Sequence, residues 1–424
     1  MFTRRRLLKA SAAGGLSLMA GGLAAPAIAQ GQRIRIGYVS PQSGPLSAFS
    51  EADQFVVEQF LQQTGDVFEV IVKDSQSNPN RASEVAQELI IDDEVHLMLV
   101  ASTPETTNPV ATVAEAEGVP IISTKAPWEP WFIGQQGNPG DPSSWRPFDF
   151  AFHYFWGAAD LTEVMVGMWN QVETTRVIGA LYPNDADGNA LGDPNTGLPP
   201  VFTERGFTVV DTGRYQNLSD DFTAQINAFK QANADIVTGV VIPPDFTTFF
   251  NQSAQQGFNP RIITVNKALL FPSSVETLGA PGNNLSCEVW WTPHHPFTSS
   301  LTGQTSAELA QAFTEATGRP WTQPIGFVHS LFEMAADVMG RVSDPEDREE
   351  VAAAIAGSNV NTIVGPVSWP GQGIPEFAAQ NVTKTPLVGG QWRHQEDGTF
   401  SLEIVENGTA PDIPKTSEMQ PMSW

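Results

Sequence analysis

The chain has 424 residues, of which 41% are apolar and 16% charged, a balance that indicates a folded chain long enough for two domains. Its 47 acidic and 22 basic groups give a formal charge of −25, which argues against a nucleic-acid partner and against binding to anionic membrane surfaces. The single cysteine, Cys287, excludes an intramolecular disulfide and a cysteine-based zinc cluster.

The N-terminus carries the pattern of an export signal. Residues 3–9 read TRRRLLK, which is a twin-arginine motif, and residues 10–25 form an apolar, glycine-rich stretch. The small residues Ala27 and Ala29 then stand where a signal peptidase reads the chain. We therefore expect a signal peptide over residues 1–29, export by the twin-arginine translocase and a periplasmic location. The alternative is an uncleaved membrane anchor, which the short apolar stretch disfavours.

Short apolar strands alternate with helical spacing in the first part of the chain. We expect strands at residues 34–39, 67–73, 96–100 and 120–123, and helices at residues 51–63, 80–91 and 104–117. This alternation is typical of a parallel sheet covered by helices on both faces. It breaks between residues 126 and 150, where Trp128, Trp131 and Trp145 lie among five prolines. We expect a loop there that folds over a site or packs against the sheet.

The alternation then resumes and predicts a second sheet. We expect strands at residues 176–182, 208–210, 235–242, 261–265 and 285–291, and helices at residues 159–172, 220–232 and 245–256. Helices follow at residues 306–317, 325–341 and 346–356. The chain closes with strands at residues 391–394 and 399–405 around Asp397 and Gly398, which is a hairpin signal.

Three local patterns, taken with this order of elements, resemble one family. They are IGYVSPQSGPL at residues 36–46, GVPIIS at residues 118–123 and TIVGPVSW at residues 362–369. The chain resembles the periplasmic solute-binding proteins of ABC importers, specifically the branched-chain amino-acid-binding type. The resemblance implies an α/β fold of two doubly wound, Rossmann-like lobes, which are joined by three hinge crossings and close on a ligand. It also implies a monomer that works with an ABC permease and ATPase.

The resemblance further implies where the lobes divide. The three crossings would lie near residues 152–157, 290–294 and 362–368. The N-terminal lobe would then consist of residues 30–153 and 293–362, and the C-terminal lobe of residues 154–292 and 363–424.

Ligands of open parallel sheets bind beyond the carboxyl ends of the strands, where polar loops follow several predicted strands. The candidate ligand-binding residues on or near these loops are Ser43, Phe49, Ser102, Thr103, Ser123, Thr124, Lys125, Trp128, Asp187, Asp245, Asn266 and Lys267. Hydroxyls at a helix start cap its N–H groups, and the same N–H groups can bind a carboxylate. The resemblance implies carboxylate contacts from residues 102–107 and 123–125 and an aromatic wall at Phe49. Trp128 and Trp156 are further aromatic candidates, with core packing as the alternative.

The loops of the second lobe depart from the amino-acid-binding pattern. That pattern implies a glutamate after the strand at residues 261–265 to hold the ligand ammonium, but this chain has Asn266 and Lys267. Because Lys267 repels an ammonium, we expect it to complete, with Lys125 of the other lobe, a site for an anionic or aromatic acid. Asp245 offers a carboxylate for an ammonium, which keeps an amino acid as the second solute class. The remaining alternative is that both lysines face solvent or pair with acids.

The sequence lacks several common catalytic motifs. The sequence has no G-x-S-x-G, no H-E-x-x-H and no P-loop, so we expect no enzyme, no cofactor and no metal. We therefore predict the periplasmic substrate-binding component of an ABC importer, which captures a small carboxylate-bearing solute by closure of two lobes. A ligand-binding sensor, or an exported enzyme, is the alternative.

Overall fold

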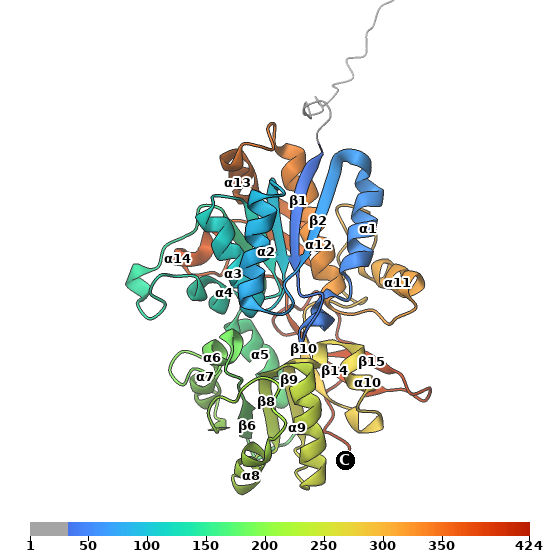
Figure 1. The fold of residues 1–424 in the computed structure, drawn as a ribbon. Helices are drawn as coiled ribbons and strands as arrows, with labels where there is room; N and C mark the ends of the chain where they lie inside the picture. Colours follow the sequence, from blue (N-terminus) through green and yellow to red (C-terminus); the bar gives the residue numbers. More distant parts are fainter. Residues whose placement is uncertain (1–32) are drawn as a thin grey trace, which may run out of the picture.

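The computed structural model describes residues 33–424, which form two lobes stacked along one axis (Figure 1). The expected signal peptide over residues 1–29 lies outside the described residues. Within the described part of the chain, no helix is both long and apolar enough to cross a membrane.

The N-terminal lobe is built on a six-stranded, wholly parallel sheet in the order β13-β5-β4-β3-β1-β2. Its strands are β1 (Ile34–Ser40), β2 (Phe68–Asp74), β3 (Leu97–Ala101), β4 (Ile121–Thr124), β5 (Ala151–Tyr154) and β13 (Val382–Thr383). The central strands are continuous apolar runs because both faces are buried. In β3, Leu97 and Leu99 join one apolar cluster, and Met98 and Val100 join the cluster on the opposite face.

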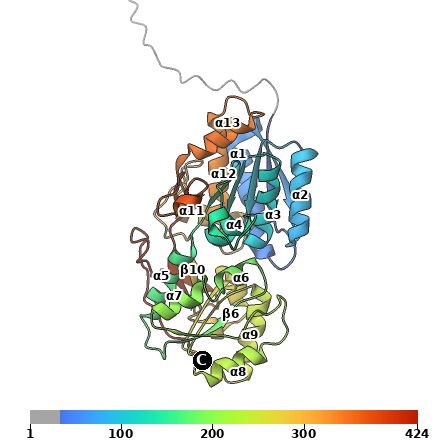
Figure 2. The ribbon, with the colours of Figure 1, turned by 90° about the vertical axis from the view of Figure 1, so that its left-hand side faces the viewer.

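Helices cover both faces of this sheet (Figure 2). The helices of the lobe are α1 (Asp53–Thr64), α2 (Pro79–Ile91), α3 (Pro104–Ala116), α4 (Trp128–Gly134), α11 (Ser306–Thr317), α12 (Pro324–Arg341), α13 (Arg348–Ala356) and α14 (Glu376–Ala379). Residues of α1 and α12 pack in the cluster of Leu97, whereas residues of α2 and α3 pack in that of Met98. Helix α2 begins at a proline, and the Asn78 side chain accepts hydrogen bonds from the first N–H groups, as the sequence signal predicts.

The C-terminal lobe contains a seven-stranded mixed sheet in the order β15-β14-β10-β9-β8-β6-β7. Its strands are β6 (Val177–Leu181), β7 (Thr208–Asp211), β8 (Ile236–Val241), β9 (Ile262–Lys267), β10 (Ser286–Val289), β14 (Val388–His394) and β15 (Phe400–Glu406). Its helices are α5 (Ala158–Trp169), α6 (Ala186–Leu191), α7 (Leu198–Glu204), α8 (Thr223–Gln231), α9 (Pro243–Gln255) and α10 (Pro272–Glu276). Strands β14 and β15 form the hairpin expected around Asp397 and Gly398, and Gly398 has the positive φ of 87° that its turn requires.

The two lobes repeat one strand order. The runs β2-β1-β3-β4-β5 and β7-β6-β8-β9-β10 are both the doubly wound order that places ligands at the carboxyl edge of the sheet. The chain passes between the lobes after β5 at residues 155–157, after β10 from residue 290, and after β13 at residues 384–387. Figure 1 shows these passages converging between the lobes.

The third passage corrects the boundary that the sequence predicts at residues 362–368. Residues 363–383 belong to the N-terminal lobe because β13 pairs in parallel with the edge of its sheet, with Val382 opposite His153. The hairpin of β11 (Asn359–Thr362) and β12 (Gly365–Ser368), which covers the expected crossing, packs on this lobe through Ile363 N, bonded to Glu333 of α12 at 2.9 Å. The crossing therefore follows β13 instead of this hairpin.

The tryptophan-rich segment over residues 126–150 packs against the sheet, which is the second of the two expected arrangements. It contains helix α4, and Trp131 of this helix is fully buried and stacks on His153 of β5 with 4.5 Å between ring centroids. Trp128, Trp131, Phe132 and Phe148 therefore belong to the core of the N-terminal lobe, and the half-buried Trp145 packs against it.

Candidate functional site

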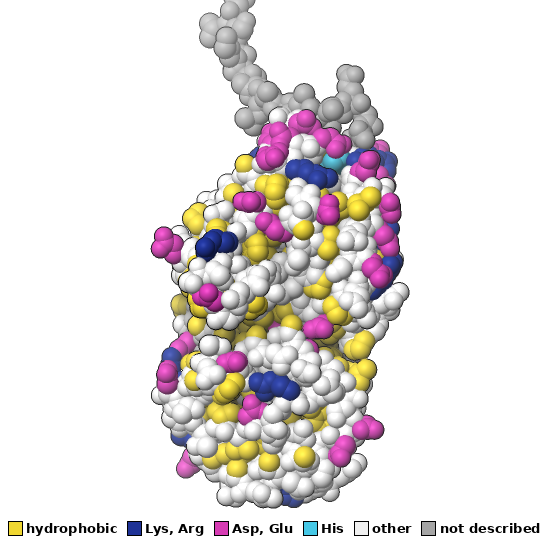
Figure 3. Space-filling view, turned by 60° about the vertical axis from the view of Figure 1, so that its left-hand side comes forward, with side chains coloured by type: hydrophobic (Ala, Val, Ile, Leu, Met, Phe, Trp, Pro, Cys, Tyr) yellow, Lys and Arg dark blue, Asp and Glu magenta, His cyan; other side chains and the backbone are white. Residues whose placement is uncertain are grey.

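A small cavity lies between the lobes, at the carboxyl ends of strands from both sheets. The surface narrows at this level, where hydrophobic side chains are visible (Figure 3). The residues that line it are Phe49, Thr103, Lys125, Pro127, Phe155, Trp156, Asp187, Leu191, Val240, Asn266, Lys267, Leu270, Glu288 and Trp290. The space within it that a water-sized sphere can occupy is about 20 Å³, room for about one water molecule, so a solute would need the lobes to stand further apart.

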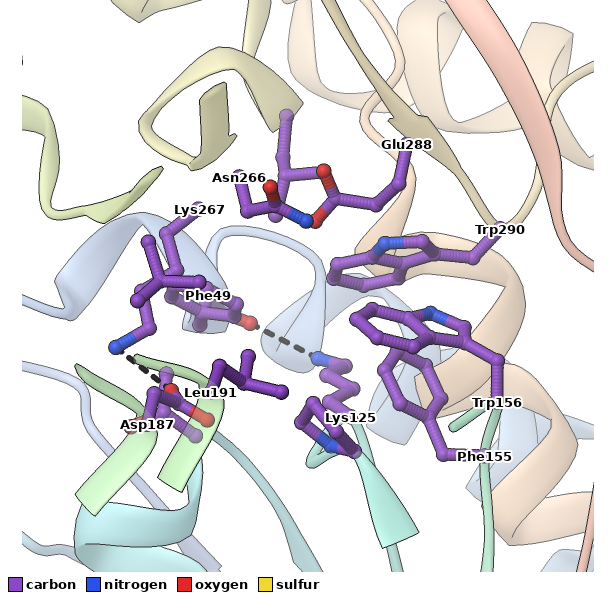
Figure 4. Close-up of a pocket in the computed structure, with 14 residues that line it drawn as sticks. Phe49, Lys125, Phe155, Trp156, Asp187, Leu191, Asn266, Lys267, Glu288 and Trp290 are labelled. Carbon is purple, nitrogen blue, oxygen red and sulfur yellow. Dashed lines mark hydrogen bonds and ion pairs between the residues drawn. The ribbon is translucent and has the colours of Figure 1, made fainter. Parts of the chain in front are cut away.

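Aromatic side chains form much of the wall of the cavity (Figure 4). Phe155 and Trp156 come from the first passage, Trp290 begins the second, and Phe49 precedes α1. The Phe49 and Trp290 rings are nearly parallel, with their centroids 6.4 Å apart and their planes inclined by 21°. Phe155 meets Trp290 edge to face at 5.1 Å. Such walls favour a flat apolar body, because ring faces gain both burial and stacking.

Lys125 brings a buried ammonium group to this wall. It follows β4 with a φ of 71°, a left-handed conformation that is uncommon outside glycine, and its side chain is almost wholly buried. Its Nζ donates a hydrogen bond of 3.0 Å to the carbonyl oxygen of Phe49. Burial lowers the pKa of Lys125 to about 8, against the attraction of the Asp53 carboxylate. No carboxylate of the described residues lies within ion-pair distance of Lys125, and its Nζ has three N–H groups but one hydrogen bond, so the others remain for a ligand anion.

Lys267 has a different environment. It ends β9 with a φ of 63°, and its Nζ lies 2.6 Å from Oδ2 of Asp187 and 3.3 Å from Oδ2 of Asp185. Burial disfavours its charge, but these two carboxylates hold the pKa of Lys267 above its usual range. Burial raises the pKa of Asp187 to about 6, against the attraction of Lys267. Lys267 is therefore neutralised within the protein, an arrangement that the sequence leaves as one alternative.

Glu288 of β10 places a second carboxyl group on the cavity. Its side chain is 2% exposed, and burial raises its pKa to about 8. Figure 4 shows the Glu288 carboxyl beside the side-chain amide of Asn266, across the cavity from Lys125. Glu288 is consequently neutral at pH 7 and carries a proton that it can donate.

Unpartnered polar atoms gather around this cavity. Six lining residues have a buried side-chain nitrogen or oxygen without a hydrogen-bond partner among the described residues: Thr103, Trp156, Asp187, Asn266, Glu288 and Trp290. Each such atom costs about 1–3 kcal/mol when it stays unpaired, so clusters of them need an explanation. A solute with polar groups at its ends and an apolar body would satisfy several of them.

Six of the twelve residues that the sequence proposes line the cavity. They are Phe49, Thr103, Lys125, Asp187, Asn266 and Lys267. They share one origin, because each lies in or beside a loop at the carboxyl end of a strand.

The other six do not line the cavity, because each has a structural role close by. Ser43 is exposed, and its Oγ donates to Oδ2 of Asp74 at 2.6 Å. Ser102 accepts a hydrogen bond of 2.8 Å from the Thr106 hydroxyl at the start of α3. Ser123 donates to the carbonyl of Phe152 at 3.1 Å.

The remaining three of these residues also have structural roles outside the cavity. Thr124 donates to the carbonyl oxygen of Tyr154 at 2.7 Å, which ties β4 to β5. Trp128 is buried in the core of the N-terminal lobe, where its backbone N donates to the Trp156 carbonyl at 3.2 Å. Asp245 is buried and accepts a hydrogen bond of 3.1 Å from the backbone N of Leu218. Asp245 does not line the cavity, whereas Asp187 and Glu288 do.

Sequence reasoning missed Glu288 and Trp290. The strand at residues 285–291 is predicted, but its residues are not assigned to the site. The available signal is a single ionisable residue, Glu288, in an otherwise apolar or small run, because a charge there needs a buried partner or a function. Trp290 lies two positions further, on the same side of the chain.

Comparison with known proteins identifies the family. A model of the periplasmic binding protein family matches residues 33–383. No protein with a curated description matches the chain in sequence. Among solved structures, a leucine-binding protein from Thermotoga maritima is 17% identical with a TM-score of 0.73, over 88% of this chain and 99% of that chain.

Two further solved structures carry aromatic ligands. A solute-binding protein of an ABC transporter from Rhodopseudomonas palustris, in complex with 3,4-dihydroxybenzoic acid, is 16% identical with a TM-score of 0.69, over 89% of this chain and 99% of that chain. Another solute-binding protein from R. palustris, in complex with benzoate, is 14% identical with a TM-score of 0.66, over 92% of this chain and 99% of that chain. At these identities the likeness shows the shared fold. With the family match over most of its length, the chain belongs to the periplasmic binding proteins, which serve ABC transporters as solute-binding components.

Proposed function

We propose that this protein captures a small aromatic carboxylate in the periplasm and delivers it to an ABC permease and its ATPase. The observation that carries the proposal is the contrast between the two lysines of the cavity. Lys267 is neutralised by two aspartates, whereas Lys125 makes its one hydrogen bond to a neutral carbonyl. The solute carboxylate would bind Lys125 and the unpartnered hydroxyl of Thr103, and its ring would lie against the aromatic wall.

The site would favour such a solute because both its charged end and its ring would be removed from water on binding. A buried ammonium binds an anion strongly because little water competes for either charge. The rings of Phe49, Trp156 and Trp290 offer apolar area without adding charge. Binding between the lobes stabilises the closed form, which is the form that would dock on the permease. We also propose export by the twin-arginine translocase and a monomeric state.

An amino acid is the second candidate, and one observation favours it. Asp187 lines the cavity, and its Oδ1 has no hydrogen-bond partner among the described residues. That oxygen would accept a hydrogen bond from an ammonium group, while Lys125 would still bind the carboxylate. The two candidate solutes therefore differ in which of their chemical groups faces the C-terminal lobe.

Isothermal titration calorimetry on the exported chain tests the proposal with benzoate, phenylalanine and leucine as probes. We expect benzoate to bind and Lys125→Met to lower its association constant roughly 100-fold, since a charge-assisted bond is lost. Lys230→Met, on α8 of the outer face of the C-terminal lobe, is the matched control and should retain the wild-type constant. Binding of leucine or phenylalanine alone, abolished by Asp187→Asn, would establish the amino-acid alternative. Equal benzoate affinity in the Lys125→Met variant would refute the carboxylate site.

A further inference from the structure

Two neighbouring strands place Glu288 and Asn266 side by side on the cavity. Strands β9 and β10 run parallel with Thr264 opposite Ser286. Side chains two residues apart in a strand share a face, so the residues two positions further, Asn266 and Glu288, also lie together. Figure 4 shows this pair beside the indole of Trp290, on the side of the cavity opposite Lys125.

Asn266 and Trp290 lie close enough to Glu288 to lower its pKa against the effect of burial, but several polar atoms of the three side chains complete no hydrogen bond. Asn266 is 2% exposed, and both its Oδ1 and its Nδ2 lack a hydrogen-bond partner among the described residues. Oε2 of Glu288 and the Nε1 of Trp290 lack one as well. A side-chain amide with both ends unpaired in a core is costly, which indicates that this pair faces a polar group of a ligand.

The charge environment of Glu288 restricts which polar group of a ligand can bind beside it. None of the ion pairs of the described residues includes Glu288, and burial is the main influence on its pKa, which it raises to about 8. The one lysine near this edge of the cavity, Lys267, is engaged by Asp185 and Asp187. Glu288 therefore stands as a carboxylic acid at neutral pH, a group that both donates and accepts hydrogen bonds.

We propose that Glu288 and Asn266 form a second polar subsite, which binds an uncharged hydroxyl group on the solute at the end remote from its carboxylate. The proposal rests on the proposed function, and it narrows the solute class to hydroxylated aromatic acids. A phenolic hydroxyl donates one hydrogen bond and accepts another, as does the pair formed by a neutral carboxyl and a carboxamide. An unsubstituted ring would leave both side chains unpaired, which selects against it.

This subsite is less suited to an ammonium group than to a hydroxyl group. An ammonium is a donor only, so it would leave the proton of Glu288 and the amide N–H groups of Asn266 without an acceptor. It would bind here only after Glu288 loses its proton, against the burial that favours the neutral form. A hydroxyl needs no change of charge.

Calorimetry on the exported chain with four matched probes tests the subsite: benzoate, 3-hydroxybenzoate, 4-hydroxybenzoate and 4-(aminomethyl)benzoate. We expect one of the hydroxybenzoates to bind roughly 100-fold more tightly than benzoate, because a site built around a hydroxyl rejects the analogue that lacks it. Glu288→Leu should reduce this ratio to near 1, whereas Glu288→Gln, which keeps a donor and an acceptor, should retain most of it. Glu276→Gln, at the exposed C-terminal residue of α10, is the control and should leave the ratio at the wild-type value.

The outcomes distinguish this proposal from the one on which it rests. Equal affinity of the wild type for benzoate and both hydroxybenzoates, or a preference that survives in Glu288→Leu, overturns the subsite but leaves the aromatic carboxylate site standing. Tighter binding of 4-(aminomethyl)benzoate than of either hydroxybenzoate overturns it in favour of an ammonium site. Binding of none of the four probes overturns both proposals. Near-ultraviolet circular dichroism of each variant shows that the aromatic core is intact.

Discussion

The carboxylate of Glu105 on α3 accepts a hydrogen bond of 3.2 Å from the backbone N of Ala186, the first residue of α6. Helix α3 belongs to the N-terminal lobe and α6 to the C-terminal lobe, so this bond joins the lobes at the edge of the cavity. Phe49 and Phe271 meet across the same cleft, edge to face at 5.1 Å. These two contacts do not depend on the solute, and neither does the hydrogen bond of 2.9 Å from Ala158 N of α5 to Oε1 of Glu129 on α4, which also joins the lobes.

We expect Glu105→Ala to weaken solute binding without unfolding either lobe. A hydrogen bond of this kind contributes about 0.5–1.5 kcal/mol, so the association constant for benzoate should fall about threefold to tenfold. Calorimetry measures it, with Glu117→Ala at the exposed end of the same helix as the control. An unchanged constant in Glu105→Ala would show that the bond does not contribute to closure.

Replacement of Lys267 is expected to lower the free energy of unfolding, which the loss of a ligand contact alone would not do. In Lys267→Met, Asp185 and Asp187 would remain buried without their cation, which typically costs 3–5 kcal/mol in the free energy of unfolding. Urea denaturation should show this loss, and the added substitution Asp187→Asn should restore part of it. If Lys267→Met unfolds at the wild-type urea concentration, the buried ion pair is not formed.

The neutral state of Glu288 predicts a pH dependence of stability. Its pKa is raised on folding from 4.5 to about 8, so the folded protein holds a proton that the unfolded chain releases. The stabilising contribution of this proton is complete below about pH 4.5 and is lost as the pH rises toward 8, with a slope of up to about 1.4 kcal/mol per pH unit. The wild type should therefore lose stability relative to Glu288→Gln between pH 5 and pH 8.

Urea denaturation of both proteins at pH 5, 6, 7 and 8 measures that difference. Using the difference cancels the other buried carboxyls, such as Glu333, whose pKa is also raised by burial. A difference that stays constant across this range would mean that Glu288 is ionised in the folded protein.

Asp53 is expected to set the pH range over which Lys125 binds an anion. Asp53 is buried at the start of α1, accepts a hydrogen bond of 2.9 Å from the Tyr38 hydroxyl, and attracts the charge of Lys125. Asp53→Asn keeps an acceptor for Tyr38 but removes the negative charge, so the pKa of Lys125 should fall further below about 8. The affinity for benzoate should then begin to fall at a lower pH than in the wild type.

Calorimetric titrations from pH 6 to pH 9 locate that fall. Glu58→Gln, on the exposed face of α1, is the control and should follow the wild-type profile. The same pH profile in Asp53→Asn and in the wild type would contradict the coupling between Asp53 and Lys125.

The sequence by itself determines the repeated α/β architecture and the strand ends at which the cavity between the lobes lies. Continuous apolar runs such as β3 and the Asn78–Pro79 helix start are local signals, because burial on both faces and capping depend on residues close together in the chain. The loops that follow the strands therefore locate the cleft, and with it Lys125, Asp187 and Asn266. Local signals do not separate a lining residue such as Thr103 from its neighbour Ser102, since both directly precede the same helix.

Only the tertiary structure decides which charges are paired and which strand completes a sheet. Lys267 meets Asp185 and Asp187 at the start of α6, about 80 residues earlier in the chain, and these carboxylates take up the charge that its sequence position offers to a solute. Glu288 joins the site through the register between β9 and β10, and β13 extends the first sheet by pairing with β5. These contacts depend on the packing of distant segments, which no local periodicity encodes, and they determine which ionisable groups of the cavity remain for a solute.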